Sequence, residues 1–150
     1  NRYTLMLIGP GGEGSDYLAR VASELDIASR VVFTGEVTEE DKIRMLQDSK
    51  YYFQLSAYEG FGISAIEALA AGNLVFHSAR GGLSDSMPPE GIEVTDIDNF
   101  PKIAETLAKV NQNYGDYQDR ISSGVRRMRE QYAYCVRKER IEAILHSLVS

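Results

Sequence analysis

The most informative segment of this chain is Glu59-Gly60-Phe61-Gly62-Ile63-Ser64-Ala65-Ile66-Glu67-Ala68-Leu69-Ala70-Ala71-Gly72. It directly follows the apolar run Tyr51–Leu55, so we expect a buried strand, a short glycine-containing turn and then a helix. The helix is predicted to begin near Ile63, because the apolar residues after the turn recur at helical spacing. Glycines let the backbone approach a ligand closely, and a helix start presents unpaired N–H groups and the positive end of the helix dipole. The stretch therefore predicts a site for a phosphate or a sugar hydroxyl.

Two glutamates flank this turn. Glu59 precedes it, and Glu67 lies eight residues later, near the second turn of the predicted helix. A carboxylate can accept two hydroxyl groups at once, which is what recognition of a vicinal diol on a ribose or a hexose requires. For either glutamate alone, a solvated surface position is the simpler interpretation. The pair and its spacing favour sugar recognition.

The segment Glu59–Ile63 followed by Glu67–Gly72 closely resembles the E-x7-E region of the retaining glycosyltransferases with the GT-B fold, family 4 in particular. The resemblance extends from Leu7-Ile8-Gly9-Pro10-Gly11 through Arg30–Gly35 to Gly81-Gly82. It implies an α/β fold, a Rossmann-like parallel sheet with helices on both faces, as the single C-terminal half of a GT-B enzyme. It also implies that residues 1–150 are a nucleotide-sugar donor-binding domain truncated at its N-terminal edge, whose first strand and helix, like the N-terminal acceptor domain, precede Asn1.

By resemblance, the whole protein transfers a hexosyl group from a UDP-, GDP- or ADP-hexose to an acceptor hydroxyl during glycan biosynthesis. The anomeric configuration is retained, no metal or other cofactor is required, and the acceptor is a carbohydrate or a lipid-linked molecule bound by the missing domain. Because half of a two-domain cleft cannot position both substrates, we expect the isolated chain to bind donor weakly and to transfer no sugar. By the same resemblance, Glu67 binds the ribose, and Glu59 binds hexose hydroxyls and is catalytic. Phosphate or hexose oxygens are bound by the N–H groups of Gly60, Phe61, Gly62 and Ile63. The nucleotide base faces the backbone around Gly35 and Val37.

A second glycine pattern supports an alternative function. Gly9-x-Gly11-x-x-Gly14 follows a predicted strand, and Glu36 follows the next strand, as in an NAD(P)-binding oxidoreductase domain. Pro10 and the Gly12-Glu13 pair make a wider and more acidic loop than a tight pyrophosphate turn. A non-catalytic sugar-nucleotide-binding module is a further alternative, and a sugar-nucleotide epimerase is a third. Hydrolysis by paired carboxylates is disfavoured, because a helix N-terminus favours anions and is a poor place for a raised acid pKa.

Composition limits the remaining classes of function. With 150 residues, 43% of them hydrophobic, the chain is long enough for one domain with a core. A net charge of −6 and a pI near 4.9 argue against a nucleic-acid partner, which needs a basic surface. The single cysteine, Cys135, and two distant histidines, His77 and His146, suggest no metal site and a reducing cytoplasm. With no apolar run of membrane-spanning length, any membrane contact of the full enzyme is expected to be peripheral, at the inner face.

Alternating patterns along the rest of the chain complete the expected fold. Four strands separated by helices predict one parallel sheet with ligands at the carboxyl ends of its strands. The glycine turns after Ile8 and Leu55, the Gly35 turn and the Gly81-Gly82 loop are all predicted at such ends and are expected to converge on one crevice. The predicted strands are Tyr3–Ile8, Arg30–Gly35, Tyr51–Leu55, Leu74–His77 and a short edge strand Ile92–Val94. The first predicted helix follows a cap at Ser15 or Asp16, and the next two begin at Thr38 and Ile63. A fourth carries the apolar stripe Phe100, Ile103, Leu107 and Val110. The last two predicted helices span Tyr114–Gln131 and Val136–Leu148.

Overall fold

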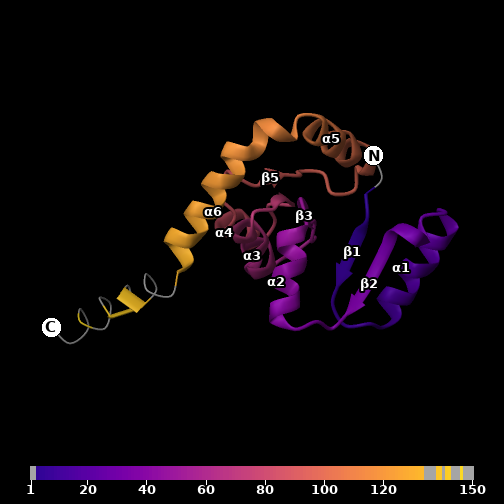
Figure 1. Ribbon diagram of the computed structural model, residues 1–150, viewed down its shortest axis with the longest axis horizontal. Helices are drawn as coiled ribbons and strands as arrows, with labels where there is room; N and C mark the ends of the chain where they lie inside the picture. Colours follow the sequence, from indigo (N-terminus) through magenta and orange to yellow (C-terminus); the bar gives the residue numbers. More distant parts are fainter. Residues whose placement is uncertain (1–2, 134–137, 140, 143–145, 147–150) are drawn as a thin grey trace. The chain divides into compact units, whose positions relative to one another are not determined.

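The computed structural model describes residues 3–133, 138–139, 141–142 and 146. The chain divides into two compact units, Asn1–Met45 and Leu46–Ser150, and each is described by itself. The elements of the first unit are drawn in indigo and purple in Figure 1, and those of the second in magenta to yellow. The last predicted helix, Val136–Leu148, lies mostly outside the described residues, as does Cys135.

The first unit pairs two parallel strands, β1 (Leu5–Ile8) and β2 (Val31–Gly35). Between them run α1 (Glu13–Glu24) and the short 3-10 helix η1 (Ala28–Arg30). The predicted caps at Ser15 or Asp16 are wrong, because α1 begins earlier, with Gly12 as its N-cap and no side-chain cap. Gly12 has a φ of 147°, a conformation that side-chain-bearing residues rarely adopt, and this lets the chain enter the helix directly after the glycine loop.

The boundary between the units lies within α2 (Glu39–Asp48). The predicted start of this helix at Thr38 is confirmed, because the Asp41 N–H donates to the Thr38 Oγ1 at 3.1 Å. Acidic residues in its first turn complement the helix dipole, as the sequence indicates.

The second unit has a three-stranded parallel sheet in the order β3-β4-β5. The central strand β4 is buried on both faces, as expected of a parallel sheet covered by helices on both sides. On one face Val75 packs with Leu69 and Met128, and on the other Leu74 and Phe76 pack with Val110. The bounds are β3 (Tyr51–Gln54), α3 (Ile63–Ala71), β4 (Leu74–His77), α4 (Leu83–Ser86), β5 (Ile92–Glu93), α5 (Phe100–Gln112), η2 (Tyr114–Tyr117) and α6 (Gln118–Tyr132).

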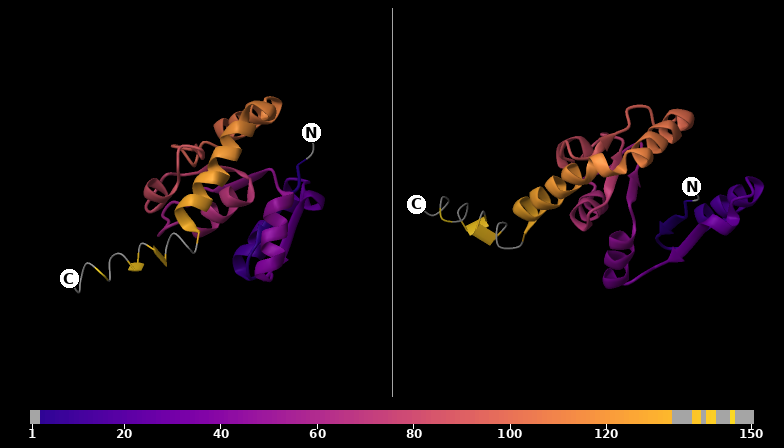
Figure 2. Two further views of the ribbon diagram at one scale, coloured as in Figure 1. Left: turned by 60° about the vertical axis from the view of Figure 1, so that its left-hand side comes forward. Right: turned by 45° about the horizontal axis from the view of Figure 1, so that its top comes forward.

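Helices α3 and α6 lie side by side over one face of this sheet, as Figures 1 and 2 show. Close packing of the two helices depends on Gly124, since a Cβ at this position would meet the Leu69 Cδ1 at 2.8 Å. The other face is covered by α5 and η2. Of the apolar stripe predicted on α5, Val110 is buried but Phe100 is 71% exposed, because it is the first residue of the helix and lies beyond the covered part.

The predicted α/β architecture with parallel strands is confirmed, but the strands form two ladders rather than one. β1 pairs with β2, and β3 with β4 and β5, while β2 and β3 do not pair.

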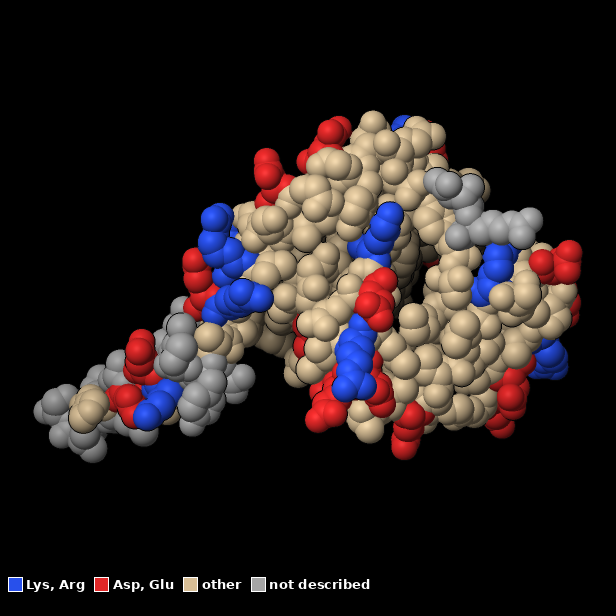
Figure 3. Space-filling view, viewed as in Figure 1, with Lys and Arg blue, Asp and Glu red and all other residues tan. Residues whose placement is uncertain are grey.

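Surface charges are mixed in sign. On the face drawn in Figure 3, blue and red side chains are interspersed, and no continuous basic stripe is visible. A typical pair is Lys42 with Glu39 on α2, at 2.8 Å. Among the described residues, none of the helices combines the length and the hydrophobicity needed to span a bilayer.

Candidate functional site

The turn between β3 and α3 ends in an uncapped helix N-terminus. Gly62 is the N-cap in a left-handed conformation, with a φ of 81°, and no side chain caps the helix. The N–H groups of Ala65 and Ile66 both donate to the Gly62 carbonyl. Within the described part of the chain, the N–H groups of Phe61, Gly62 and Ile63 donate no hydrogen bond. The turn therefore leaves three neighbouring donors, at the positive end of the α3 dipole, for an anion or a hydroxyl.

Glu59 lies at the start of the same turn with its side chain half-buried. Its Oε1 accepts a hydrogen bond from the Gly60 N–H at 3.0 Å, and its Oε2 accepts one from the Gln54 Nε2 at 2.9 Å. The Gly60 N–H, which the resemblance assigns to the ligand, is thus used within the turn. The other three predicted donors make no hydrogen bond within the part of the chain that the structure describes.

Glu67 is carried by α3 rather than by the turn. It lies four residues after Ile63, about 6 Å farther along the helix axis, and is half-buried. The structure thus places one carboxylate before the uncapped N-terminus and the other on the helix that begins there. The roles of both glutamates toward a ligand stay predictions.

The Gly81-Gly82 pair packs directly against the turn. The Gly82 N–H donates to the Glu59 carbonyl at 2.7 Å. A Cβ at Gly82 would meet the Gly60 oxygen at 2.0 Å, and a Cβ at Gly81 would meet the Glu59 oxygen at 2.4 Å. The sequence predicted that this loop would lie beside the turn, and within the second unit the two are brought together. Both positions require glycine, because the backbone of residues 59–61 lies too close to leave room for a Cβ atom.

Contacts from α4 and α6 also hold the turn. The Ser86 Oγ of α4 donates to the Phe61 carbonyl at 2.6 Å, and the Phe61 ring makes an edge-to-face contact with Tyr132 of α6. Leu83 fills the space beside Gly62, where a Cβ would approach the Leu83 Cδ2 to 2.4 Å. The turn is therefore supported by both α4 and α6.

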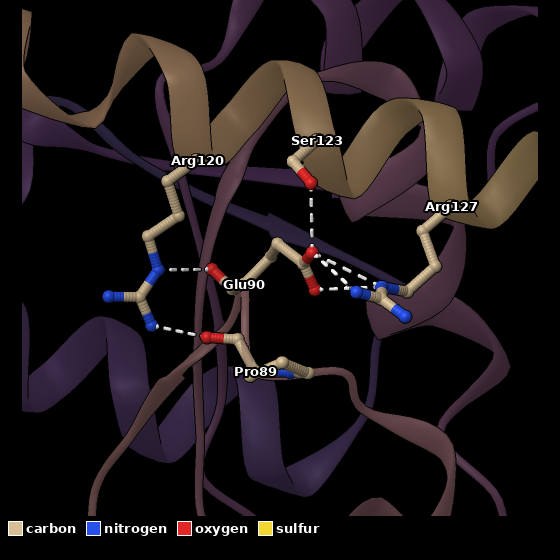
Figure 4. A network of polar contacts seen from close by, with 5 residues as sticks. All are labelled: Pro89, Glu90, Arg120, Ser123 and Arg127. Atoms are coloured by element: carbon tan, nitrogen blue, oxygen red, sulfur yellow. Dashed lines mark hydrogen bonds and ion pairs between the residues drawn. The ribbon is translucent and has the colours of Figure 1, made fainter.

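Helix α6 is in turn fixed to the loop before β5 by a polar network (Figure 4). Arg127 binds the buried carboxylate of Glu90 through its Nε and Nη2, and the Ser123 Oγ donates to the same carboxylate at 3.0 Å. Arg120 donates to the carbonyls of Pro89, Glu90 and Gly91. Burial by itself would raise the pKa of Glu90, but the hydrogen bonds from Arg127 and Ser123 outweigh it and hold the pKa below its ordinary value.

The first unit has a small cavity at the carboxyl ends of its strands. Its volume is about 130 Å³, and its lining includes the glycine loop Gly9–Gly11, Ser15 and Phe33. The Gly9 N–H donates to the Gly35 carbonyl at 3.2 Å, so the two glycine turns of this unit meet, as the sequence predicted. Val37, the residue assigned to the base, follows this turn and is half-buried, while Glu36 is exposed. Whether this cavity and the α3 turn share one ligand stays a prediction.

Among the described residues, no group of three or more His, Cys, Asp or Glu side chains could hold a metal ion. His77 at the end of β4 is buried, and its Nδ1 has no hydrogen-bond partner. Burial lowers the pKa of His77, Glu93 raises it and Arg120 lowers it further, with burial the largest effect. The net effect is a pKa of His77 below its ordinary value.

Comparison with known proteins identifies the family. Residues 1–128 match the model of the glycosyl transferases group 1 family. The chain belongs to this family. Its relatives include an uncharacterized glycosyltransferase, MJ1607, from Methanocaldococcus jannaschii, with 29% identity over 133 residues, 86% of this chain and 33% of that protein. They also include the D-inositol 3-phosphate glycosyltransferase of Mycobacterium ulcerans, with 33% identity over 111 residues, 69% of this chain and 24% of that protein.

Solved structures of other proteins share the fold. Sucrose-phosphate synthase from Thermosynechococcus elongatus aligns with a TM-score of 0.85 at 23% identity, over 97% of this chain and 38% of that one. Anabaena HepE in complex with UDP-glucose aligns with a TM-score of 0.83 at 20% identity, over 96% of this chain and 41% of that one. The chain spans about a third or less of the length of the curated relatives named above. The predicted GT-B architecture is confirmed.

The residues that support Glu59 were not predicted from the sequence. Gln54 and Tyr52 lie at alternate positions of β3, so their side chains point to the same face of the sheet. The signal was present in the run Tyr51–Leu55, where a single amide interrupts apolar and aromatic residues at the end of a buried strand. An amide at the half-buried end of a strand favours a hydrogen-bond partner nearby, so Gln54 could have been expected to bind a polar group in the turn that follows.

Proposed function

We propose that this group 1 glycosyltransferase chain is a donor-binding domain, in a retaining enzyme that moves a hexosyl group from a nucleotide sugar to an acceptor hydroxyl. The observation that carries the proposal is the uncapped N-terminus of α3, where the N–H groups of Phe61, Gly62 and Ile63 lie free beside the Glu59 carboxylate. A nucleotide sugar offers both of the chemistries that this turn accepts: phosphate oxygens for the N–H donors and sugar hydroxyls for the carboxylate.

In this proposal the N–H groups bind the phosphate nearest the hexose. When the bond between the hexose and the diphosphate breaks, negative charge develops on the leaving phosphate oxygen. Preoriented N–H donors at a helix N-terminus stabilise such charge without having to reorganise. The turn therefore favours departure of the diphosphate, and the donors act most strongly in the transition state.

The two glutamates bind hydroxyl groups. Glu59, held at the start of the turn, accepts from hydroxyls of the hexose and is the proposed catalytic residue, and Glu67 on α3 accepts from the ribose. The backbone around Gly35 and Val37 is proposed to meet the base. The chain needs no metal in this proposal, because helix amides meet the charge of the phosphate.

The relatives support a nucleotide-sugar donor. Structures of Anabaena HepE, whose fold this chain shares, hold UDP-glucose or UDP. The mycobacterial relatives are named D-inositol 3-phosphate glycosyltransferases. A cytoplasmic location, with any membrane contact of the full enzyme at the inner face, is part of the proposal.

Transfer requires more than this chain supplies. The acceptor, whether a carbohydrate or a lipid-linked molecule, would bind to the rest of a GT-B enzyme, since the chain covers only part of its relatives' length. We expect the chain alone to bind donor and to transfer no sugar. Transfer above background by the isolated chain, measured with labelled donor and a panel of acceptors, would contradict this expectation.

The proposal is tested by calorimetric titration of the chain with UDP-, GDP- and ADP-glucose and with NADH. Saturable binding of one nucleotide sugar, weakened roughly tenfold or more by Glu67→Ala, is the expected result. Glu105→Ala, which removes an exposed helical glutamate on α5, is the matched control and should leave the affinity unchanged. Binding of NADH alone, unaffected by Glu67→Ala, would favour the oxidoreductase alternative at Gly9–Gly14.

A further inference from the structure

Gln54 makes a hydrogen-bonded connection between the half-buried end of strand β3 and the carboxylate of Glu59. Its Nε2 donates to the Glu59 Oε2 and to the Ser56 Oγ, each at 2.9 Å. Its Oε1 accepts from the Tyr52 hydroxyl at 3.0 Å. Every polar atom of this amide therefore has a partner within five residues along the chain, and one of these partners is the proposed catalytic group.

The connection fixes which end of the amide faces Glu59. A carboxylate only accepts hydrogen bonds, so the NH2 group must face it, and the amide oxygen then requires a donor on its other side. The Tyr52 hydroxyl is that donor. Tyr52 is itself held by packing against the core cluster that includes Leu69 and Val75, so the orientation of the amide is set by the core.

Both oxygens of Glu59 are consequently held by neutral donors of this chain. The Gly60 N–H binds Oε1 and the Gln54 NH2 binds Oε2, so the carboxylate plane is fixed from both sides. Each oxygen of an ionised carboxylate accepts about two hydrogen bonds, so capacity for a ligand hydroxyl remains at both. A half-buried side chain held in this way meets a ligand without losing further rotamer freedom.

We propose that Gln54 is a positioning residue, which holds Glu59 in the orientation that accepts the hydroxyls of the donor hexose. This inference rests on the proposed function, since it requires Glu59 to face the hexose. A residue that merely completed the end of β3 would contribute to folding and would have no separate effect on recognition of the sugar.

The test compares two ligands of the same chain: the nucleotide sugar selected by titration and the corresponding nucleoside diphosphate, which lacks the hexose. Gln54→Leu removes the amide at similar volume. We expect affinity for the nucleotide sugar to fall roughly tenfold to hundredfold, as for loss of a hydrogen bond to a charged group, with affinity for the nucleoside diphosphate unchanged. Tyr52→Phe releases the amide orientation and should give a smaller loss of the same kind.

Tyr51→Phe is the matched control for Tyr52→Phe. Tyr51 is the preceding residue of β3, points to the opposite face and donates its hydroxyl to Asn111 on α5. Like Tyr52→Phe, the Tyr51→Phe variant removes a partly buried phenol hydroxyl, but it should leave both affinities unchanged.

Gln54→Glu adds a pH readout that a purely structural role would not give. The new carboxyl can donate to Glu59 only while it is protonated, so nucleotide-sugar affinity should be low at neutral pH and recover as the pH is lowered. This variant also carries the test if Gln54→Leu does not fold.

The outcomes separate the inference from the function on which it rests. If Glu59→Gln weakens nucleotide-sugar binding while Gln54→Leu and Gln54→Glu do not, the positioning role is wrong and the function stands. If Glu59→Gln itself has no effect on binding, the proposed site fails and the inference fails with it. An equal loss for both ligands in the Gln54 variants would show a structural role and overturn the inference.

Discussion

Replacing Gly82 by alanine tests the packing on which the candidate site depends. The added Cβ would lie 2.0 Å from the Gly60 oxygen and 2.8 Å from the Phe61 Cα, both of them backbone atoms that cannot rotate away. An ordinary carbon–oxygen contact requires more than an ångström of additional separation, so the Gly81-Gly82 loop and the turn must move apart. The Gly82 N–H bond to the Glu59 carbonyl would then lengthen or break.

The expected cost follows from these two effects. Overpacking in a closely packed region costs about 1–3 kcal/mol, and a lost backbone hydrogen bond about 1 kcal/mol more. We therefore expect Gly82→Ala to lower the free energy of unfolding by about 2–4 kcal/mol, a large fraction of the roughly 5–15 kcal/mol of a typical domain. Urea unfolding followed by circular dichroism measures this difference.

Gly60→Ala is the matched control in the same turn. A Cβ at Gly60 meets no atom within 4 Å, so the free energy of unfolding should change by less than about 0.5 kcal/mol. The same methyl group would project into open space at the proposed ligand site, so donor affinity should fall while stability does not. If Gly82→Ala is as stable as the wild type, or if Gly60→Ala is equally destabilised, the described contact between the two loops is wrong.

Three further predictions concern the elements beneath the site. Arg120→Met should lower the free energy of unfolding by about 2 kcal/mol, because the carbonyls of residues 89–91 lose their donor. The control variant Arg126→Met, on the exposed face of α6, should change the free energy of unfolding by less than about 0.5 kcal/mol. Since His77 has a lowered pKa in the folded chain, its protonation favours unfolding, so stability should fall as the pH drops below about 6.5. His77→Leu should weaken that dependence between about pH 7 and 5 in urea titrations. Since hydrogen bonds hold the pKa of Glu90 low, its stabilisation is present above about pH 4.3 and is lost as the pH falls further, and Glu90→Gln should remove this acid-range slope.

Much of the second unit could be predicted from sequence because its signals are local. Gly60 and Gly62 before an apolar run at helical spacing located the start of α3 at Ile63, and the apolar run of β4 was predicted to the residue. The division of the strands into two sheets was not predicted, since strands that follow one another in the sequence do not have to be neighbours in a sheet. Periodicity alone also placed Phe100 in the core, although a helix extends beyond the surface that it covers.

The details of the site depend on contacts that a linear pattern does not contain. The sequence suggested that Gly81-Gly82 lies near the turn, but only the three-dimensional contacts show that its glycines are required by the backbone of residues 59–61. The same is true of Gly60, whose N–H group binds Glu59, and of Gln54, whose amide orientation depends on Tyr52. Hydrogen bonds between side chains and the backbone decide these positions.

The most direct test of the proposed site is a map of amide chemical-shift changes when the isotope-labelled chain is saturated with the nucleotide sugar that it binds. A ligand at the α3 N-terminus should shift the amide resonances of Phe61, Gly62 and Ile63 most strongly, because these N–H groups would gain an acceptor. The same three resonances should move less when Glu59 is replaced by glutamine. Saturable binding that leaves them unshifted, with changes confined to Gly9–Gly14, would contradict the proposed site.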